Sequence, residues 1–524
     1  MSADTTTSAL SDPYEELARR RRQGLEGGGE RYIEKIRATG RQTARERIDQ
    51  LIDAGSWYEL GMLAEPEYRR PDKITTGDGV VTGLGRIDGR RVAIIAIDTT
   101  VLTGTTAPVN MRKQNRIAEW AGRRHIPLIC LSDNDGGRLP DLLGWRFSGV
   151  PFDFGTFLQS PAGEPAIPHM TAVLGPAYGD AALHAAMGHF VVMRKDAAVA
   201  LSGPPVIEAA IGETVEAEEL GGPKVAHETS GAVHAVVERE DEAFDAIRRY
   251  LSFMPDSAAL PAPVAPPLPP ARDPSELETL VPREPRRGYD MRKVIDCIVD
   301  EGSLLQWGER YGRSLITGFA RIEGNPVGMI ASQPMQRAGV LDVPALSKLA
   351  GFAKLCDTFN IPLVFLQDVP GLMIGKDAER GGILAGYKNV VTTLAYARVP
   401  KIAVVVRKAY GGGHIALGGR PVRPDLLFAW PTAEMGFMAP DTGVRTVYRR
   451  RLEQVLAEEG KEAHDTLVAE LELEWAAESE PWEAAANIIL DDVIEPADTR
   501  TRIAMGIDYA WPTGERVTPT GAST

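Results

Sequence analysis

Residues 126–133 read IPLICLSD and residues 361–368 read IPLVFLQD, so the chain carries nearly the same apolar segment twice, 235 positions apart. A short, continuous apolar run bounded by turn residues is typical of a strand buried inside a parallel sheet. Each segment also follows a stretch with helical periodicity and precedes a glycine-containing turn. This alternation of helix and strand predicts an α/β fold.

A second pair of segments repeats at almost the same interval. Residues 171–180 read TAVLGPAYGD and residues 403–412 read AVVVRKAYGG, which places Tyr178 and Tyr410 232 positions apart. Each of these segments is again an apolar strand that enters a glycine turn. Two matches at a near-constant interval are hard to obtain by chance, and we therefore predict two related α/β domains in one chain.

A proline-rich stretch separates the two copies. Residues 255–285 contain ten prolines, and such a stretch sustains neither a helix nor a central strand. We place the domain boundary there, with an N-terminal domain over 1–260, a linker over 261–285 and a C-terminal domain over 286–524.

Composition limits the possible partners. The 524 residues include 58 Lys or Arg and 72 Asp or Glu, a formal net charge of −14. This balance offers no general attraction for nucleic acid or anionic lipid, so neither partner is expected. The three cysteines lie far apart in apolar contexts, which favours buried thiols in a reducing compartment. With neither a signal peptide nor an apolar run of ~18 residues, we expect a soluble cytoplasmic protein.

The glycine turns are the candidate chemical groups. A strand, a glycine turn and a helix leave main-chain amides free to bind a phosphate or to stabilise an oxyanion, although ordinary tight turns are the alternative. The P-loop, GxGxxG, GxSxG and HExxH patterns are all missing. His184, His227 and His414 lie near the turns, but a structural role is favoured over that of a general base. No metal site is indicated.

Several longer motifs resemble one known family, the carboxyltransferase (β) subunits of biotin-dependent acyl-CoA carboxylases of the propionyl-CoA and acetyl-CoA type. The resemblance covers about residues 14–512. The motifs that carry it are LEGGG at 25–29, TARERI at 43–48, SGPPVI at 202–207, ELGG at 219–222, FNIPLVFL at 359–366, DVPG at 368–371, RKAYGG at 407–412 and AWPTAE at 429–434.

The resemblance implies two crotonase-like domains in tandem, each a ββα spiral, and a homohexamer. It places the active site between the N-terminal domain of one subunit and the C-terminal domain of its partner. The N-terminal domain holds the acyl-CoA, and the C-terminal domain holds carboxybiotin. Carboxybiotin releases CO2, and its ureido anion removes the α-proton of the thioester, which explains why no side-chain base is evident.

Two oxyanion holes made of main-chain amides follow from the same resemblance. Gly412 and Gly413 are implied for biotin, and Gly179 and Asp180 for the thioester carbonyl. Further acyl-CoA contacts are implied for Gly136, Gly137, Arg138, Tyr178, His184 and Ile415, and biotin contacts for Tyr410, Gly411, Gly412, Gly413 and His414.

The sequence departs from the family pattern mainly in the acyl-CoA half. Asp180 stands where the family usually has glycine; its carboxyl could repel an enolate, be protonated, turn away, bind a polar acyl group or cap the helix. Residues 133–141 read DNDGGRLPD, and the aromatic-rich segment 145–169 also diverges, either as core or as a border of the substrate pocket. In the other half, Ile415 occupies a position that the family associates with acyl-chain choice.

We therefore predict a carboxyltransferase that moves CO2 from carboxybiotin to the α-carbon of an acyl-CoA, with an atypical acyl group. The chain has no biotinylation motif and no ATP-grasp loop, so the biotin carboxylase and carrier (α) subunit must be a separate partner. Two alternatives stay open: a decarboxylase of a malonyl-type thioester, and a non-catalytic assembly subunit. The glycines at 411–413 argue against the latter, whereas Asp135 and Asp180 are compatible with it.

Overall fold

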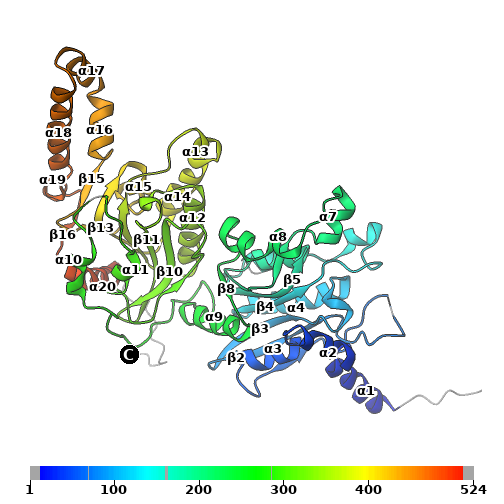
Figure 1. Cartoon of the computed structure of the whole chain (residues 1–524). Coiled ribbons are helices and arrows are strands. Elements are labelled where there is room, and N and C mark those ends of the chain that lie inside the picture. The colour runs from blue at the N-terminus through cyan, green and yellow to red at the C-terminus, as the bar shows by residue number, and fades with distance from the viewer. Residues whose placement is uncertain (1–11, 69, 160–162, 285, 511–524) are drawn as a thin grey trace, which may run out of the picture. The chain divides into compact units, whose positions relative to one another are not determined.

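The computed structural model describes residues 12–68, 70–159, 163–284 and 286–510 (Figure 1). The chain divides into two compact units, residues 1–226 with 236–248, and residues 227–235 with 249–524. The domain limits of 1–260, 261–285 and 286–524 remain a prediction from the sequence. In the division by structure, residues 249–285 belong to the second unit.

The first unit is built on an eight-stranded sheet of order β1-β2-β3-β4-β5-β6-β8, with β7 paired to β5. β1 to β3 pair antiparallel, whereas β3 to β6 are parallel. The strands are β1 (Tyr58–Leu60), β2 (Val80–Ile87), β3 (Arg90–Ile97), β4 (Leu128–Asn134), β5 (His169–Tyr178), β6 (Phe190–Arg194), β7 (Ala198–Ala200) and β8 (Ala235–Val237). The helices are α1 (Pro13–Glu26), α2 (Glu30–Ala38), α3 (Ala44–Leu51), α4 (Pro108–Arg123), α5 (Phe154–Gln159), α6 (Asp180–Ala186), α7 (Pro204–Ile211), α8 (Ala217–Gly221) and α9 (Glu240–Phe253).

The second unit has a matching eight-stranded sheet of order β16-β14-β13-β12-β11-β10-β9, with β15 paired to β13. The strands are β9 (Leu305–Gln306), β10 (Leu315–Ile322), β11 (Asn325–Ser332), β12 (Leu363–Val369), β13 (Lys401–Tyr410), β14 (Leu426–Ala429), β15 (Glu434–Gly436) and β16 (Asp492–Val493). Its helices are α10 (Leu277–Leu280), α11 (Met291–Ile295), α12 (Val343–Thr358), α13 (Lys376–Arg380), α14 (Ile383–Tyr396), α15 (Gly411–Ala416), α16 (Pro440–Val447), α17 (Arg449–Glu458), α18 (Lys461–Glu478), α19 (Pro481–Ala486) and α20 (Thr499–Ala510).

The two sheets repeat one another in register, as the sequence predicted. Ile129 pairs with Ile94 and Met170 in the first sheet, and Val364 pairs with Met329 and Ile402 in the second. Every residue of β4 and of β12 is buried, which explains why both strands begin with an apolar run; the polar residues at their ends are buried as well. The predicted α/β class, with two related crotonase-like halves, is confirmed.

The proline-rich segment is attached to the second unit through its main chain. The Ala265 amide donates to the carbonyl of Gly324 at 3.0 Å. Asn360 Nδ2 donates to the carbonyls of Ala258 at 2.9 Å and Leu260 at 3.0 Å. Asn360 has a φ of 57°, a left-handed conformation that asparagine tolerates better than alanine.

Asn360→Ala is expected to lower the free energy of unfolding by about 1–3 kcal/mol, because it removes two hydrogen bonds and strains the backbone. Urea denaturation measures the change. Asn360→Gly, which loses the hydrogen bonds but accepts the positive φ, should lose less. Equal stability of Asn360→Ala and the unaltered protein would contradict this account.

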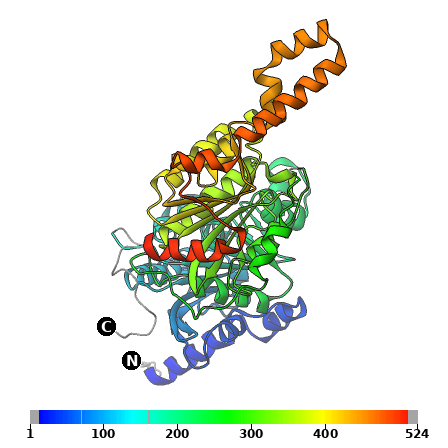
Figure 2. The same cartoon turned by 90° about the vertical axis from the view of Figure 1, so that its left-hand side faces the viewer.

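Helices α16, α17 and α18 form an arm that stands clear of the second sheet in both views (Figures 1 and 2). The arm has its own small core, made of Val444, Leu452, Val468 and Leu471. Among the described residues, no helix combines the length and the apolar character needed to span a bilayer.

Candidate active site

Two glycine turns follow the central parallel strands of the first unit. Gly136 follows β4 with a φ of 98°, and Gly179 follows β5 with φ 68° and ψ −126°. Only glycine adopts the second conformation readily, since a Cβ would clash with the backbone. A Cβ at Gly179 would meet no described atom within 4 Å, so there is open space beside this turn.

The second unit carries the equivalent turns after β12 and β13. Gly371 has a φ of 139°, and Gly411 opens α15 with a φ of 50°. The packing there is tight: a Cβ on Gly413 would lie 2.7 Å from Val369 Cγ2, and one on Gly412 would lie 2.9 Å from Leu372 Cδ1. Within the described chain the amides of Gly412 and Gly413 have no acceptor, as expected for the first residues of a helix.

In each unit, one residue is hydrogen-bonded through its main chain to the glycine turn that follows the central strand, and the two units do this in the same way. The Thr106 amide donates to Gly136 O at 2.9 Å, and the Arg138 amide donates to Thr106 O at 2.8 Å. In the second unit Leu341 makes the same two bonds, accepting from Met373 and donating to Gly371 O. Each of the three residues in the first unit lies 235 positions before its counterpart in the second unit, so the turns themselves are repeated elements.

A buried aspartate lies at the end of the central strand in each unit. Asp133 Oδ2 accepts from Arg47 Nη2 at 2.9 Å, and Asp368 Oδ2 accepts from Arg407 Nη2 at 2.8 Å. Both aspartate side chains are at most 1% exposed. Each ion pair fixes the strand from which a glycine turn departs.

Asp180, at the first position of α6, is held by one side-chain hydrogen bond. Its Oδ2 accepts from Thr106 Oγ1 at 2.7 Å. Burial raises the pKa of the Asp180 carboxyl to about 6, against the opposing effect of the Thr106 hydrogen bond. The Gly179 amide itself donates to Ala200 O at 3.2 Å, so it is already engaged by the neighbouring strand.

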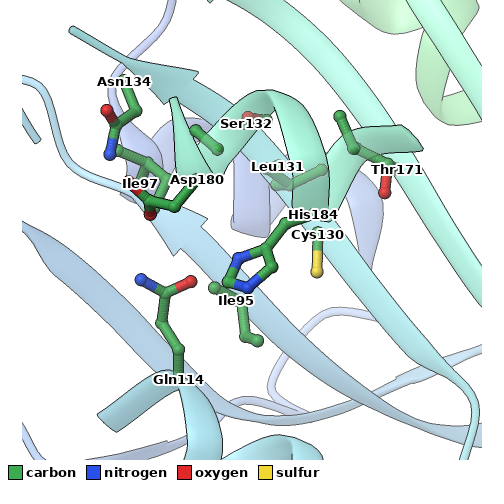
Figure 3. A pocket seen from close by; sticks show the side chains of 12 residues that line it. Ile95, Ile97, Gln114, Cys130, Leu131, Ser132, Asn134, Thr171, Asp180 and His184 are labelled. Carbon is green, nitrogen blue, oxygen red and sulfur yellow. The ribbon is translucent and has the colours of Figure 1, made fainter. Parts of the chain in front are cut away.

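A small cavity lies beneath α6, between the sheet and helix α4 (Figure 3). Its polar or sulfur-bearing lining includes Gln114, Cys130, Ser132, Thr171, Asp180 and His184. The cavity volume is about 20 Å³, which has room for one water molecule and not for an acyl chain.

His184 is buried under the turn and does not reach the surface. Its ring stacks on Phe157 with centroids 4.3 Å apart, and Phe154 contacts it edge-on at 5.5 Å. Burial lowers the pKa of His184 to about 3, so the ring is neutral. Part of the divergent aromatic segment is therefore core, whereas Trp145 and Phe147 are exposed.

Arg138 faces inward. Its guanidinium pairs with Asp78 and donates to Thr105 O at 2.7 Å, and the side chain is 4% exposed. The structure thus shows Arg138 as part of an internal ion pair, and a direct contact with acyl-CoA stays a prediction.

Two further predicted acyl-CoA residues differ in exposure. Gly137 is exposed beside Arg138, and Tyr178 is nearly buried against Gly203.

On the second unit, the predicted biotin residues Tyr410 and His414 are fixed by hydrogen bonds. Tyr410 Oη donates to Glu434 Oε2 at 2.6 Å, and burial raises the pKa of Tyr410. His414 Nδ1 lies 2.8 Å from Gln367 Oε1, whose amide donates to Leu417 O. Burial lowers the pKa of His414 to about 4. Ile415 is partly exposed on the same helix.

Sequence reasoning missed the residues that hold the turns in place. They are Thr106, Asn134, Gln367 and Glu434. Thr106 could have been noticed through the repeat, since it lies 235 positions before Leu341, but no local motif marks it.

In the described parts of the chain, no cluster of three or more His, Cys, Asp or Glu side chains is arranged to hold a metal ion.

Comparisons with known proteins agree with this geometry. Residues 35–520 match the family described as "Carboxyl transferase domain". The chain is 36% identical over 500 residues to the propionyl-CoA carboxylase carboxyltransferase subunit of Haloferax mediterranei, covering 94% of this chain and 95% of that protein. It is 33% identical over 505 residues to the methylmalonyl-CoA decarboxylase subunit alpha of Propionigenium modestum, covering 95% of each.

A solved structure shows the same architecture over almost the whole chain. The transcarboxylase 12S hexamer with methylmalonyl-coenzyme A bound is 35% identical, covers 98% of both chains and superimposes with a TM-score of 0.87. The chain therefore belongs to the carboxyl transferase domain family, as a carboxyltransferase (β) subunit of the biotin-dependent acyl-CoA carboxylase type.

Proposed function

We propose that this chain transfers CO2 from carboxybiotin, borne on a separate carrier polypeptide, to the α-carbon of an acyl-CoA. The observation that carries the proposal is the repeated glycine turn. Each copy follows a central parallel strand and opens a helix, and the second offers two amides without an acceptor in the described chain. Amides aimed at an oxygen that gains charge are an effective way to stabilise a transition state.

The second unit would hold biotin through the turn at 411–413. Gly412 and Gly413 would donate main-chain hydrogen bonds to the ureido oxygen, which glycine allows because no Cβ stands in the way. Tyr410 and His414 would shape the sides, each fixed by its own partner. Carboxybiotin, when bound, supplies the CO2 and the base. His414 is neutral and hydrogen-bonded, so we assign it positioning and not proton transfer.

The first unit would hold the thioester beside the turn at 179–180. The open space at Gly179 admits the carbonyl, and the amide of Asp180 would donate to the enolate oxygen. Gly136, Gly137 and Tyr178 would border the acyl-CoA. We assign His184 and Arg138 supporting roles, since both are buried and engaged inside the unit.

The proposal includes the assembly and its partners. The chain would work with a biotin carboxylase and biotin carrier (α) subunit and form a homohexamer, as transcarboxylase 12S does. No metal in this chain is required by the proposed chemistry. The three cysteines are free and buried, which fits a reducing compartment and supports the cytoplasm as the site of action.

An acyl-CoA panel tests the proposal directly. The purified chain is combined with a biotinylated α subunit, ATP and ¹⁴C-bicarbonate, and acid-stable product is counted for acetyl-, propionyl- and longer or polar acyl-CoAs. We expect turnover, with a preference for an atypical acyl group because Ile415 and the Asp180 turn depart from the family. Absence of product with every acyl-CoA would overturn the proposal.

A second candidate is decarboxylation of a malonyl-type thioester. It is favoured by the similarity to a protein named methylmalonyl-CoA decarboxylase subunit alpha. Release of CO2 from malonyl- or methylmalonyl-CoA, measured with and without a biotinylated carrier and without ATP, distinguishes the two. Faster decarboxylation than carboxylation at matched substrate would favour this second function.

A further inference from the structure

A chain of side-chain hydrogen bonds joins the two glycine turns of the first unit. It begins at Asn134, whose Oδ1 accepts from the Gly136 amide. Asn134 Nδ2 donates to Gly104 O at 2.9 Å and to Thr106 Oγ1 at 3.1 Å. Because a backbone amide can only donate and a carbonyl can only accept, the orientation of the Asn134 amide is fixed.

The direction of the next bond follows from the first. Thr106 Oγ1 accepts from Asn134, so its single hydrogen is left for Asp180 Oδ2, 2.7 Å away. Thr106 is fully buried, and its main chain is bonded to Gly136 and Arg138. Thr106 therefore contacts both turns, one through its backbone and the other through its hydroxyl.

The hydroxyl is the principal stabiliser of the Asp180 carboxylate. The titratable groups that line the same cavity are His184 on α6 and Cys130 on β4. Both are uncharged near neutrality, because burial lowers the pKa of His184 to about 3 and raises that of Cys130 to about 12. The glycine turn after β4 carries two charged groups. Asp135 is exposed, and Arg138 is paired with Asp78.

The geometry of Asp180 has a consequence for the reaction. Its carboxyl is drawn toward Thr106 and the cavity, while the space at Gly179 stays open. Released from Thr106, the carboxylate could turn toward that space, where it would repel a developing enolate and compete for the amides.

We propose that Thr106, oriented by Asn134, is a positioning residue of the acyl-CoA half-site, which ties the Asp180 carboxylate back from the open side of the Gly179 turn. This rests on the proposed function of that turn, and it explains how an aspartate is accommodated where the family usually has glycine.

A double-mutant cycle tests the proposal. Thr106→Val keeps the shape of the side chain and removes the hydroxyl, and it is expected to lower kcat/KM for the acyl-CoA about tenfold or more, mainly through kcat. Thr106→Ser should restore most of the activity. In an Asp180→Gly background, Thr106→Val should change kcat/KM less than about twofold, because no carboxylate remains to be held.

Thr171→Val is the matched control. Thr171 is a buried threonine of β5 that lines the cavity beneath α6, as Asp180 does, and its hydroxyl has no partner in the described chain. Its replacement should leave kcat/KM within about twofold of the starting value. If Thr106→Val lost as much activity in the Asp180→Gly background as it does with Asp180 in place, the proposal would be overturned.

A readout independent of activity separates this proposal from the proposed function. Because its folded-state pKa is raised to about 6, Asp180 contributes stability below the ordinary carboxyl pKa, and this contribution is lost as pH rises through about 6. The melting temperature of the assembled protein minus that of Asp180→Asn, followed from pH 4 to 8, reports this loss. In a Thr106→Val background the loss should move upward by about one pH unit. An unmoved curve would overturn the proposal even if no acyl-CoA were carboxylated.

Discussion

Gly412→Val is expected to lower kcat for carboxyl transfer by about 10²–10³-fold while the protein keeps its fold. A Cβ at this position would lie 2.9 Å from Leu372 Cδ1 and 3.2 Å from its Cγ. Leu372 contributes the end of a flexible side chain, so it can move, and the φ of Gly412 lies outside the left-handed region. The valine side chain would crowd Leu372 and Tyr387 beside the turn and so displace the amides of Gly412 and Gly413. The measurement is steady-state transfer from a carboxylated biotin carrier, with circular dichroism to verify the fold.

Gly351→Ala provides a matched glycine replacement in the same unit. Gly351 is an exposed residue of α12, and its Cβ would meet only Trp307 at 3.6 Å, an ordinary contact. This variant should keep its kcat and gain slightly in stability, because alanine favours a helix by about 1 kcal/mol over glycine. If Gly412→Val also kept its kcat, the turn at 411–413 would not bind the reacting group.

The repeat explains why so much of the fold could be predicted. The strands in IPLICLSD and IPLVFLQD are buried on both faces, so most of their residues are apolar, and both copies kept this apolar run and the aspartate that follows it. The turns after β5 and β13 kept a glycine because Gly179 and Gly411 have a positive φ, which other residues adopt less readily. Local constraints of this kind leave a local signature in the sequence.

The contacts that hold the turns left no such signature. Thr106 reaches Asp180 across 74 positions, and Arg47 reaches Glu240 across 193. A hydroxyl or a guanidinium can meet any acceptor that the fold brings near, so its type does not reveal its partner. Arg138 is the opposite case, in which a motif was present but implied a different contact. The motif suggested a contact with a ligand, whereas the guanidinium pairs with Asp78 inside the unit.

The buried lysines Lys113 and Lys348 are a further example. They lie 235 positions apart, and each ammonium donates to main-chain carbonyls, those of Gly77 and Val80 in the first unit, and of Gly308 and Leu315 in the second. Burial lowers their pKa values to about 8 and about 7. The sequence alone would place a lysine on the surface, and only comparison of the two halves would have indicated a shared internal role.

Arg47→Met is expected to lower the free energy of unfolding by about 3–5 kcal/mol, the largest effect on stability that we predict. Arg47 Nη2 lies 2.9 Å from Asp133 Oδ2 and 2.7 Å from Glu240 Oε1, and its Nε donates to Glu240 Oε2 at 3.0 Å. All three side chains are at most 4% exposed. Methionine fills similar space but leaves two buried carboxylates with fewer partners. Urea denaturation of the full chain measures the loss.

The cause of that loss is unpaired charge and not lost packing, which further variants can separate. Adding Asp133→Asn and Glu240→Gln to Arg47→Met removes the unpaired charges and should recover part of the stability. Arg37→Met, which breaks an exposed pair with Glu46 at 2.7 Å, should cost much less stability than Arg47→Met, since surface ion pairs contribute little. Similar losses for Arg37→Met and Arg47→Met would mean that the buried network contributes no more than a surface pair, and that β4 is held by its apolar contacts alone.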